Sequence, residues 1–442
     1  MKPELLSPAG NLEKLKYAFA FGADAVYAGV PKYSLRTREN DFRNESLAEG
    51  MAYARAIGKK VYLTLNIYAH NTKINGFLKE MDRLSEYKPD ALIMADPGLI
   101  AQTIKRYPDI PIHLSTQANA TNWTAVSFWR DIGVKRIILS RELRLKEIAE
   151  IHEKVPDIEL ESFVHGAICI AYSGRCLISN YMNNRDANQG TCTNSCRWEY
   201  TMGQDNSLVN FEKEQHAKRH TNPIEVPEGL YVTEPKRPDQ KFPIDEDEHG
   251  TYLFNAKDLC AIELLNDLKN AGIVSFKIEG RTKSAYYAAM TARAYRKAID
   301  DIEMKKPFDE ENLRNLVALS NRGFTTGFYM HNPRELGENV QDSRSSERTH
   351  KPVGTDCRFD EEAKLLWFEV KNKLDKGTEV EIITRDSIKK MEATDLRNDK
   401  ERHVPSLHGG TGRGAIHCDE NPGEFAIIRR KLYPEELELI QV

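Results

Sequence analysis

The first third of the chain alternates short apolar, β-branched runs with amphipathic segments whose apolar positions recur every three to four residues. This alternation is typical of βα units and predicts a parallel sheet. Eight predicted units favour a closed, TIM-like (β/α)8 barrel over the alternative, an open doubly wound sheet. The predicted strands are Glu4–Ser7, Ala25–Gly29, Lys60–Asn66, Ala91–Asp96, Ile112–Gln117, Arg136–Ser140, Glu159–His165 and Ser275–Glu279.

The connection after the seventh predicted strand, residues 166–256, is much longer than the usual two to six residues. Its first part, to about residue 200, is rich in cysteine, whereas residues 203–245 are polar and predict a mobile surface flap. We therefore expect one barrel domain over residues 1–335, including this insertion.

A second domain is predicted over residues 345–442, after a polar linker at 332–351. Strand-like runs separated by turn residues indicate a small all-β barrel or sandwich there. The predicted strands are Leu365–Val370, Thr378–Ile383, Gly414–Cys418 and Glu424–Arg430.

Composition narrows the class of protein. The chain has 442 residues, 40% of them apolar, and no apolar run reaches the roughly 18 residues that span a bilayer. With no secretory signal either, we expect a cytoplasmic protein without a membrane partner. The net charge of −4 argues against a globally basic nucleic-acid binder but allows a local basic face. No Walker loop or G-x-G-x-x-G motif is present, so ATP and nicotinamide chemistry are not indicated.

Four of the seven cysteines are clustered. Cys169, Cys176, Cys192 and Cys196 follow the seventh predicted strand with the spacing C-x6-C-x15-C-x3-C, which would place them over the barrel mouth. Thiolates bind soft metals, so the set suits zinc or an iron–sulfur cluster. Zinc ribbons favour C-x2-C pairs, and this set has none, so the spacing favours an iron–sulfur cluster over zinc. Free buried thiols are the alternative, and Cys260 is a possible substitute ligand.

Polar residues at the predicted strand ends are candidates for chemistry, because sites on such barrels lie at the carboxyl ends of the strands. His165 and Glu279 are our candidates for proton transfer, although His165 and Cys169 could instead form a nucleophile–base pair. Arginine forks recognise carboxylates or phosphates, which indicates an anionic substrate. The predicted substrate-binding residues are Arg36, Arg38, Arg141, Arg175, Arg281, Asn66 and Gln117.

Several sequence blocks resemble one known family, the collagenase-like peptidase family U32. They span about residues 1–300, and the predicted C-terminal β domain also fits the family. The blocks are Leu5–Gly10, Gly22–Gly29, Glu161–Cys169, Tyr172–Ser179, Asn188–Trp198 and Lys277–Arg281.

Within that family the chain is most similar to a bacterial branch that acts in prephenate-dependent 5-hydroxylation of the wobble uridine of tRNA. The resemblance implies an iron–sulfur cluster, expected to be 4Fe-4S, on Cys169, Cys176, Cys192 and Cys196; Cys196 is the ligand that varies among relatives. It also implies tRNA as a partner, a dicarboxylate such as prephenate as co-substrate, and an electron-donor protein. Two alternatives stay open: a peptidase that uses Cys169 or a bound metal, and a non-catalytic partner of another hydroxylase.

Overall fold

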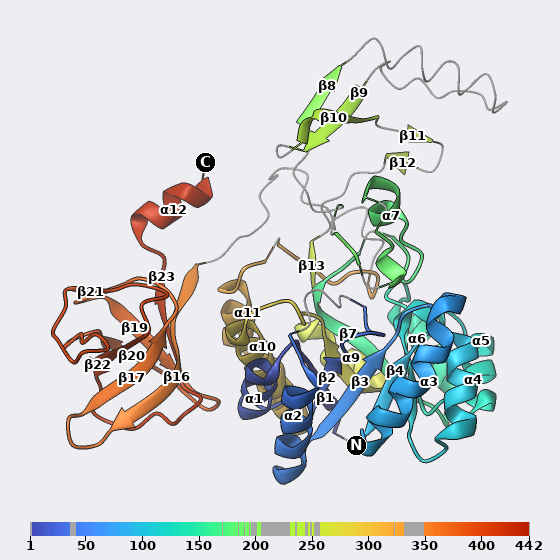
Figure 1. Cartoon of the computed structure of the whole chain (residues 1–442), viewed down its shortest axis with the longest axis horizontal. Helices are drawn as coiled ribbons and strands as arrows, with labels where there is room; N and C mark the ends of the chain where they lie inside the picture. The colour runs from blue at the N-terminus through green and yellow to red at the C-terminus, as the bar shows by residue number, and fades with distance from the viewer. Residues whose placement is uncertain are drawn as a thin grey trace.

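The computed structural model consists of a barrel, an insertion within it and a C-terminal β domain (Figure 1). Among the residues that it describes, no helix is long and apolar enough to cross a membrane. The described residues are 2–35, 41–169, 257–321, 323–330 and 349–441, and within the insertion 171–183, 185–189, 191–193, 195, 201–204, 230–234, 237–243, 246–247 and 250–251.

Eight parallel strands form a closed barrel, as predicted. Each strand pairs with the next along the chain, and β14 pairs with both β7 and β1, which closes the ring and excludes an open sheet. The strands are short and mostly buried on both faces, because side chains fill the interior and helices cover the outside. They are β1 (Glu4–Ala9), β2 (Ala25–Gly29), β3 (Lys60–Leu65), β4 (Ala91–Met94), β5 (Ile112–Leu114), β6 (Arg136–Ile138), β7 (Glu159–Ala167) and β14 (Ile273–Ile278).

Helices surround this barrel, and local signals fix where several of them begin. The Asp96 side chain accepts a hydrogen bond from the Leu99 backbone at the start of α4, and Asn122 and Ser284 cap α5 and α10 in the same way. The helices are α1 (Leu12–Ala20), α2 (Asn44–Ala56), α3 (Asn71–Glu86), α4 (Pro97–Arg106), α5 (Trp123–Ile132), α6 (Leu145–Lys154), α9 (Leu265–Asn270), α10 (Ala285–Glu303) and α11 (Glu310–Val317).

The insertion between β7 and β14 has strands that the sequence did not predict. β8 (Thr201–Gln204), β9 (Leu230–Glu234) and β10 (Arg237–Pro243) form an antiparallel sheet in the order β10-β9-β8. β10 contains two prolines, which read as a loop but are tolerated on an edge strand. The remainder of the predicted flap lies outside the described residues. Further elements here are α7 (Ile178–Asn183), η3 (Ala187–Gln189), β11 (Glu246–Asp247), β12 (Gly250–Thr251), β13 (Asp258–Cys260) and, after the barrel, β15 (Phe324–Thr325).

The predicted all-β C-terminal domain is confirmed as an antiparallel half-barrel. Its six strands are ordered β20-β19-β23-β16-β17-β22 around a separate apolar core. The sequence missed β16, which begins inside the predicted linker, and β20, whose two lysines read as a loop. The elements are β16 (His350–Asp360), β17 (Leu365–Val370), β18 (Leu374–Asp375), β19 (Glu379–Ile383), β20 (Ile388–Glu392), β21 (Ser406–Leu407), β22 (Arg413–His417), β23 (Ile427–Lys431) and α12 (Pro434–Gln441).

The half-barrel docks on α1, α10 and α11 of the barrel through buried polar contacts. The Arg429 guanidinium donates to the Tyr286 hydroxyl at 3.2 Å and to Asn315 Oδ1 at 3.0 Å. The Asp356 backbone NH donates to the Tyr17 hydroxyl at 2.8 Å. Because Arg429 is buried and makes directional bonds, this interface fixes the orientation of the two domains.

Candidate functional site

The described residues between 169 and 195, which we call the cysteine segment, dock on loops at the carboxyl ends of the barrel strands. The Ser173 backbone NH donates to Glu142 Oε1 at 3.0 Å, in the loop that follows β6. In the loop after β3, the Tyr68 backbone NH donates to the Asn188 carbonyl at 3.3 Å. Contacts from both ends of the segment therefore hold it at the barrel mouth, on the side of β3 to β6.

Gly174 sets how closely this segment approaches β5. Its φ of +74° is a left-handed conformation, and a Cβ there would lie 2.5 Å from the Gln117 carbonyl oxygen. Only glycine meets both requirements without strain. Gln117 in turn accepts a hydrogen bond from Asn66 Nδ2 at 2.7 Å and donates to the Asn66 carbonyl at 2.9 Å. The structure thus brings these two predicted binding residues together as a support for the cysteine segment.

Two of the predicted arginines hydrogen-bond to the mouth itself. Arg141 Nη1 donates to the Ala167 carbonyl at 2.8 Å, at the end of β7. Arg281 Nη1 donates to Ser34 Oγ at 2.7 Å and so anchors the loop after β2. These contacts give both side chains a structural task, and substrate binding by them stays a prediction. Outside the described residues lie Arg36 and Arg38.

The three described cysteines of the segment lie within electrostatic reach of one another. Burial raises the pKa of the Cys176 thiol, and Cys169 and Cys192 raise it further. A nearby positive charge, such as a bound cation, would favour the thiolate form of Cys176. Across the described residues, no group of three or more His, Cys, Asp or Glu is close enough to hold a metal ion. Cys196 lies outside that set, so the four-cysteine centre stays a prediction.

His165 lies behind the mouth, among aromatic rings. It is fully buried, its ring centroid is 5.9 Å from that of Tyr287, and its Nδ1 is 3.3 Å from the Tyr295 hydroxyl. Burial lowers the pKa of His165 to about 3, so the imidazole is neutral at physiological pH. Cys260 approaches the same Tyr295 hydroxyl, at 3.8 Å. This arrangement joins His165 to the core, and nothing in it forms a pair between His165 and Cys169.

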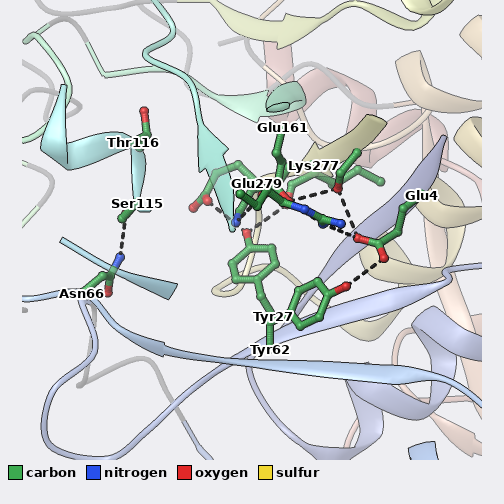
Figure 2. A network of polar contacts seen from close by, with 12 residues as sticks. Glu4, Tyr27, Tyr62, Asn66, Ser115, Thr116, Glu161, Lys277 and Glu279 are labelled. Atoms are coloured by element: carbon green, nitrogen blue, oxygen red, sulfur yellow. Dashed lines mark hydrogen bonds and ion pairs between the residues drawn. The ribbon is translucent and has the colours of Figure 1, made fainter. Parts of the chain in front are cut away.

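Glu279, the other predicted proton-transfer residue, directly follows β14 and lies among the charged and tyrosine side chains of the barrel interior (Figure 2). The Tyr27 hydroxyl donates to Glu279 Oε2 at 3.1 Å. Lys277, two residues earlier on the same inward face, lies 4.5 Å from the Tyr27 ring centroid and 2.9 Å from Glu161 Oε1. Burial lowers the pKa of Lys277, although the Glu161 carboxylate opposes that shift.

The charges continue towards the amino ends of the strands. Arg136 Nη1 is 3.2 Å from Glu161 Oε2 and 2.6 Å from Glu4 Oε1. Burial alone would raise the pKa of Glu161, but Lys277 and Arg136 outweigh it and lower that pKa. We call Glu4, Arg136, Glu161 and Lys277 the interior charge column, with Glu279 at its mouth end.

Sequence reasoning gave the column residues no role. The available signal was polar residues at alternate positions of otherwise apolar strands, as in Ser275, Lys277 and Glu279. That period of two places all three side chains on one face of a strand, which in a closed barrel is the interior. Charges there must be paired with one another, because the desolvation penalty of a lone charge is large.

Comparisons with known proteins agree with these features. The model of peptidase family U32 matches residues 10–339, and the model of the family's C-terminal domain matches residues 348–429. The chain is 48% identical over 395 residues to the tRNA hydroxylation protein P of Haemophilus influenzae, which covers 87% of this chain and 86% of that protein.

Two further relatives come from Escherichia coli. The tRNA hydroxylation protein P is 46% identical over 418 residues, covering 92% of each chain. A 23S rRNA 5-hydroxycytidine synthase is 33% identical over 300 residues, covering 68% of this chain and 39% of that protein. Because the family models together span most of the sequence, this chain belongs to peptidase family U32.

Proposed function

We propose that this chain is a tRNA-modifying hydroxylase that uses prephenate to add a hydroxyl group at C5 of the wobble uridine. The observation that carries the proposal is a sequence identity of 46–48%, over nearly the whole chain, to proteins named for tRNA hydroxylation. A relative named for 5-hydroxycytidine formation supports the C5 position of a pyrimidine as the reaction centre. The docked cysteine segment supports a redox reaction at the barrel mouth.

In this proposal Cys169, Cys176, Cys192 and Cys196 hold an iron–sulfur cluster. When bound, such a cluster supplies electron transfer or activates an oxygen donor, with an electron-donor protein as partner. The contacts of the cysteine segment with the loops after β3, β5 and β6 keep the three described thiols near the mouth. The protein's part is thus to position the redox centre beside the substrate base.

Glu279 is the proposed proton acceptor. Replacing the C5 hydrogen of uracil by a hydroxyl group is a two-electron oxidation. The oxygen donor activated at the cluster is the proposed oxidant, and the C5 hydrogen leaves as a proton, which needs a base near that carbon. The Tyr27 hydroxyl orients the Glu279 carboxylate, and the Lys277 ammonium beneath it stabilises negative charge there. We no longer give His165 this task, because its buried ring is a weak base that faces Tyr295.

The mouth arginines are the proposed binding groups for prephenate. Arg141, in the loop after β6, and Arg281, shortly after the end of β14, border the mouth. Two carboxylates need two cationic partners, and guanidinium forks match them in shape. This distribution around the rim suits a dianionic co-substrate between the cluster and the target base.

The first test measures 5-hydroxyuridine in tRNA by mass spectrometry. A strain lacking the gene is complemented with wild type, Glu279→Gln or Glu159→Gln, the last being a half-exposed carboxylate on the same barrel. We expect loss of the nucleoside with Glu279→Gln and full recovery with Glu159→Gln. Unchanged 5-hydroxyuridine in the deletion strain would overturn the proposal.

A reconstitution separates an enzyme from a non-catalytic partner. Anaerobically purified protein is mixed with tRNA, prephenate and a reductant, and the product nucleosides are analysed. If 5-hydroxyuridine forms in this mixture, this chain catalyses the step. Product that forms only after a separate hydroxylase, rather than an electron-donor protein, is added would instead make the chain a partner of that hydroxylase.

The family name also raises peptidase activity. A cysteine peptidase needs a thiol within hydrogen-bond reach of a base, and His165 bonds to Tyr295 rather than to Cys169. In the described part of the chain, His165 therefore does not form the nucleophile–base pair with Cys169 that a cysteine peptidase would use. Cleavage of denatured collagen by the purified apo-protein, lost on Cys169→Ala alone, would revive this second function.

A further inference from the structure

The cysteine segment exposes three aromatic or apolar side chains that are close together in sequence. Tyr172, Leu177 and Tyr181 are 54%, 68% and 88% exposed. Among the described residues, these are three of the five large hydrophobic side chains that are more than half exposed, and they lie within ten residues of sequence. Single exposed hydrophobic residues are ordinary, but a group of them marks a binding surface.

Arginines accompany these rings. Arg175 and Arg185 are both exposed, and Arg175 follows Tyr172 in a turn closed by a 2.9 Å backbone hydrogen bond. Leu177 and Tyr181 are one helical turn apart, joined by a 2.8 Å backbone bond, and so lie on one side of the chain. We call Tyr172, Arg175, Leu177, Tyr181 and Arg185 the tyrosine–arginine face.

The position of this face relates it to the mouth. Ser173, next to Tyr172, bonds to Glu142, and Gln189 accepts a hydrogen bond from Lys73 Nζ at 2.9 Å. The face therefore belongs to a segment fixed at both ends to the rim of the barrel. A ligand that reached the mouth from solvent would pass beside it.

We infer that the tyrosine–arginine face binds the unpaired nucleotides that flank the target uridine, with Tyr172 and Tyr181 stacking on bases and Arg175 and Arg185 contacting phosphates. The inference rests on the proposed function and extends it to the recognition of RNA. Single-stranded RNA is bound by aromatic platforms and cationic side chains, because every base has a stacking face and every linkage a charge. Since the net charge of the protein is −4, such a local set must supply the attraction.

Binding of a fluorescent hairpin RNA that carries an anticodon loop tests the inference without turnover. Full-length holoprotein is titrated against the hairpin, and anisotropy gives the Kd. We expect Tyr181→Ala and Tyr172→Ala each to weaken binding by about 5- to 150-fold, the range for one lost base stack. Tyr181→Phe should bind like wild type, because the ring is retained. Arg175→Gln and Arg185→Gln should each lower the slope of log K against log salt by about 0.7.

Phe128→Ala is the matched control, because Phe128 is 55% exposed on the outer helix α5, away from this segment in sequence. Iron content and visible absorbance are recorded for every variant, so that a lost cluster is not mistaken for lost stacking. Unchanged RNA affinity in Tyr181→Ala and Tyr172→Ala would overturn the inference. So would a change from oligomer to monomer on sedimentation without change in RNA affinity, which would make the face a contact between copies.

The RNA-binding assay and the hydroxylation assay can fail separately, so the inference and the proposed function are tested apart. A wild-type protein that binds the hairpin through these residues, yet forms no 5-hydroxyuridine, would refute the proposed function and keep the RNA surface. The reverse result, hydroxylation that persists in Tyr172→Ala and Tyr181→Ala with unaltered Kd, would refute the surface and keep the function.

Discussion

Replacing Lys277 by methionine tests whether the interior charge column depends on its central ion pair. Lys277 and Glu161 are both fully buried, and their charged atoms are 2.9 Å apart. Removing one partner of such a pair costs about 3–5 kcal/mol, because a buried charge is left uncompensated. Glu161 keeps Arg136 at 3.2 Å and Ser275 Oγ at 3.0 Å, so we expect the lower end, about 3 kcal/mol.

The double variant Lys277→Met with Glu161→Gln should recover at least half of that loss. It removes the stranded charge, and Arg136 remains paired with Glu4 at 2.6 Å. The measurement is urea unfolding at pH 7, followed by tryptophan fluorescence in a Trp367→Phe background. The remaining tryptophans, Trp123, Trp129 and Trp198, precede the half-barrel in sequence, so the signal excludes that domain. The energy that couples the two sites is expected to be about 1.5 kcal/mol or more.

The deficit of the Lys277→Met variant should also depend on pH. The pKa of Glu161 in the folded protein is below its ordinary value of 4.5, so its ionised form stabilises the fold above about pH 4.5 and loses that effect as pH falls. The variant lacks much of this stabilisation, so its deficit should shrink in acid. A deficit under about 1 kcal/mol, or no recovery in the double variant, would refute the account of the column.

Three other changes test the buried His113, the cysteine segment and the interface between the two domains. Burial lowers the pKa of His113 to about 3 from 6.5, so unfolding takes up a proton below pH 6.5; His113→Phe, which keeps the contact with the Tyr62 ring, should reduce the loss of stability between pH 7 and pH 5 by about 2 kcal/mol in urea unfolding. Gly174→Ala should lower iron per chain without changing the melting temperature of the barrel, whereas Gly58→Ala, at a similar φ of +66° with open space around it, should leave iron content unchanged. Arg429→Met should make the half-barrel separately susceptible to limited proteolysis, since it breaks the bonds to α10 and α11; unchanged digestion would show that apolar contacts suffice.

The barrel could be predicted because each of its strands and helices has a recognisable pattern in its own stretch of sequence. Each of the eight strands is a short run rich in apolar residues, and all eight appear within a few residues of the expected bounds. Strands that lack this signal were missed. In β20, Lys389 and Lys390 interrupt the apolar alternation, and β16 owes its first residues to pairing with β23 rather than to its own sequence. Tertiary pairing overrides local pattern at such places.

From the sequence, the candidate site could be predicted only where the residue types themselves indicate a chemical role. Four clustered cysteines are rare enough to stand out, whereas a charge in a strand resembles any solvent-facing alternation. Lys277 and Glu161 are separated by 116 positions, and their pairing appears only when β14 closes the ring. For His165, the place at a strand end suggested access to solvent, whereas the structure packs the ring against Tyr287 and Tyr295 of α10. Its role in proton transfer stays a prediction.

The late arrival of β14 has a consequence for synthesis. More than a hundred residues, 168–272, separate it from its neighbour β7, although the entropy of closing so long a loop grows only with the logarithm of its length. Until the ribosome has released β14, β1 lacks its second neighbour and β7 has, beside β6, only β13 at its carboxyl end. Exposed strand edges invite pairing with other chains. The cysteines leave the ribosome within that interval. In the proposed function, a cluster on these cysteines would therefore be assembled while the sheet is still open.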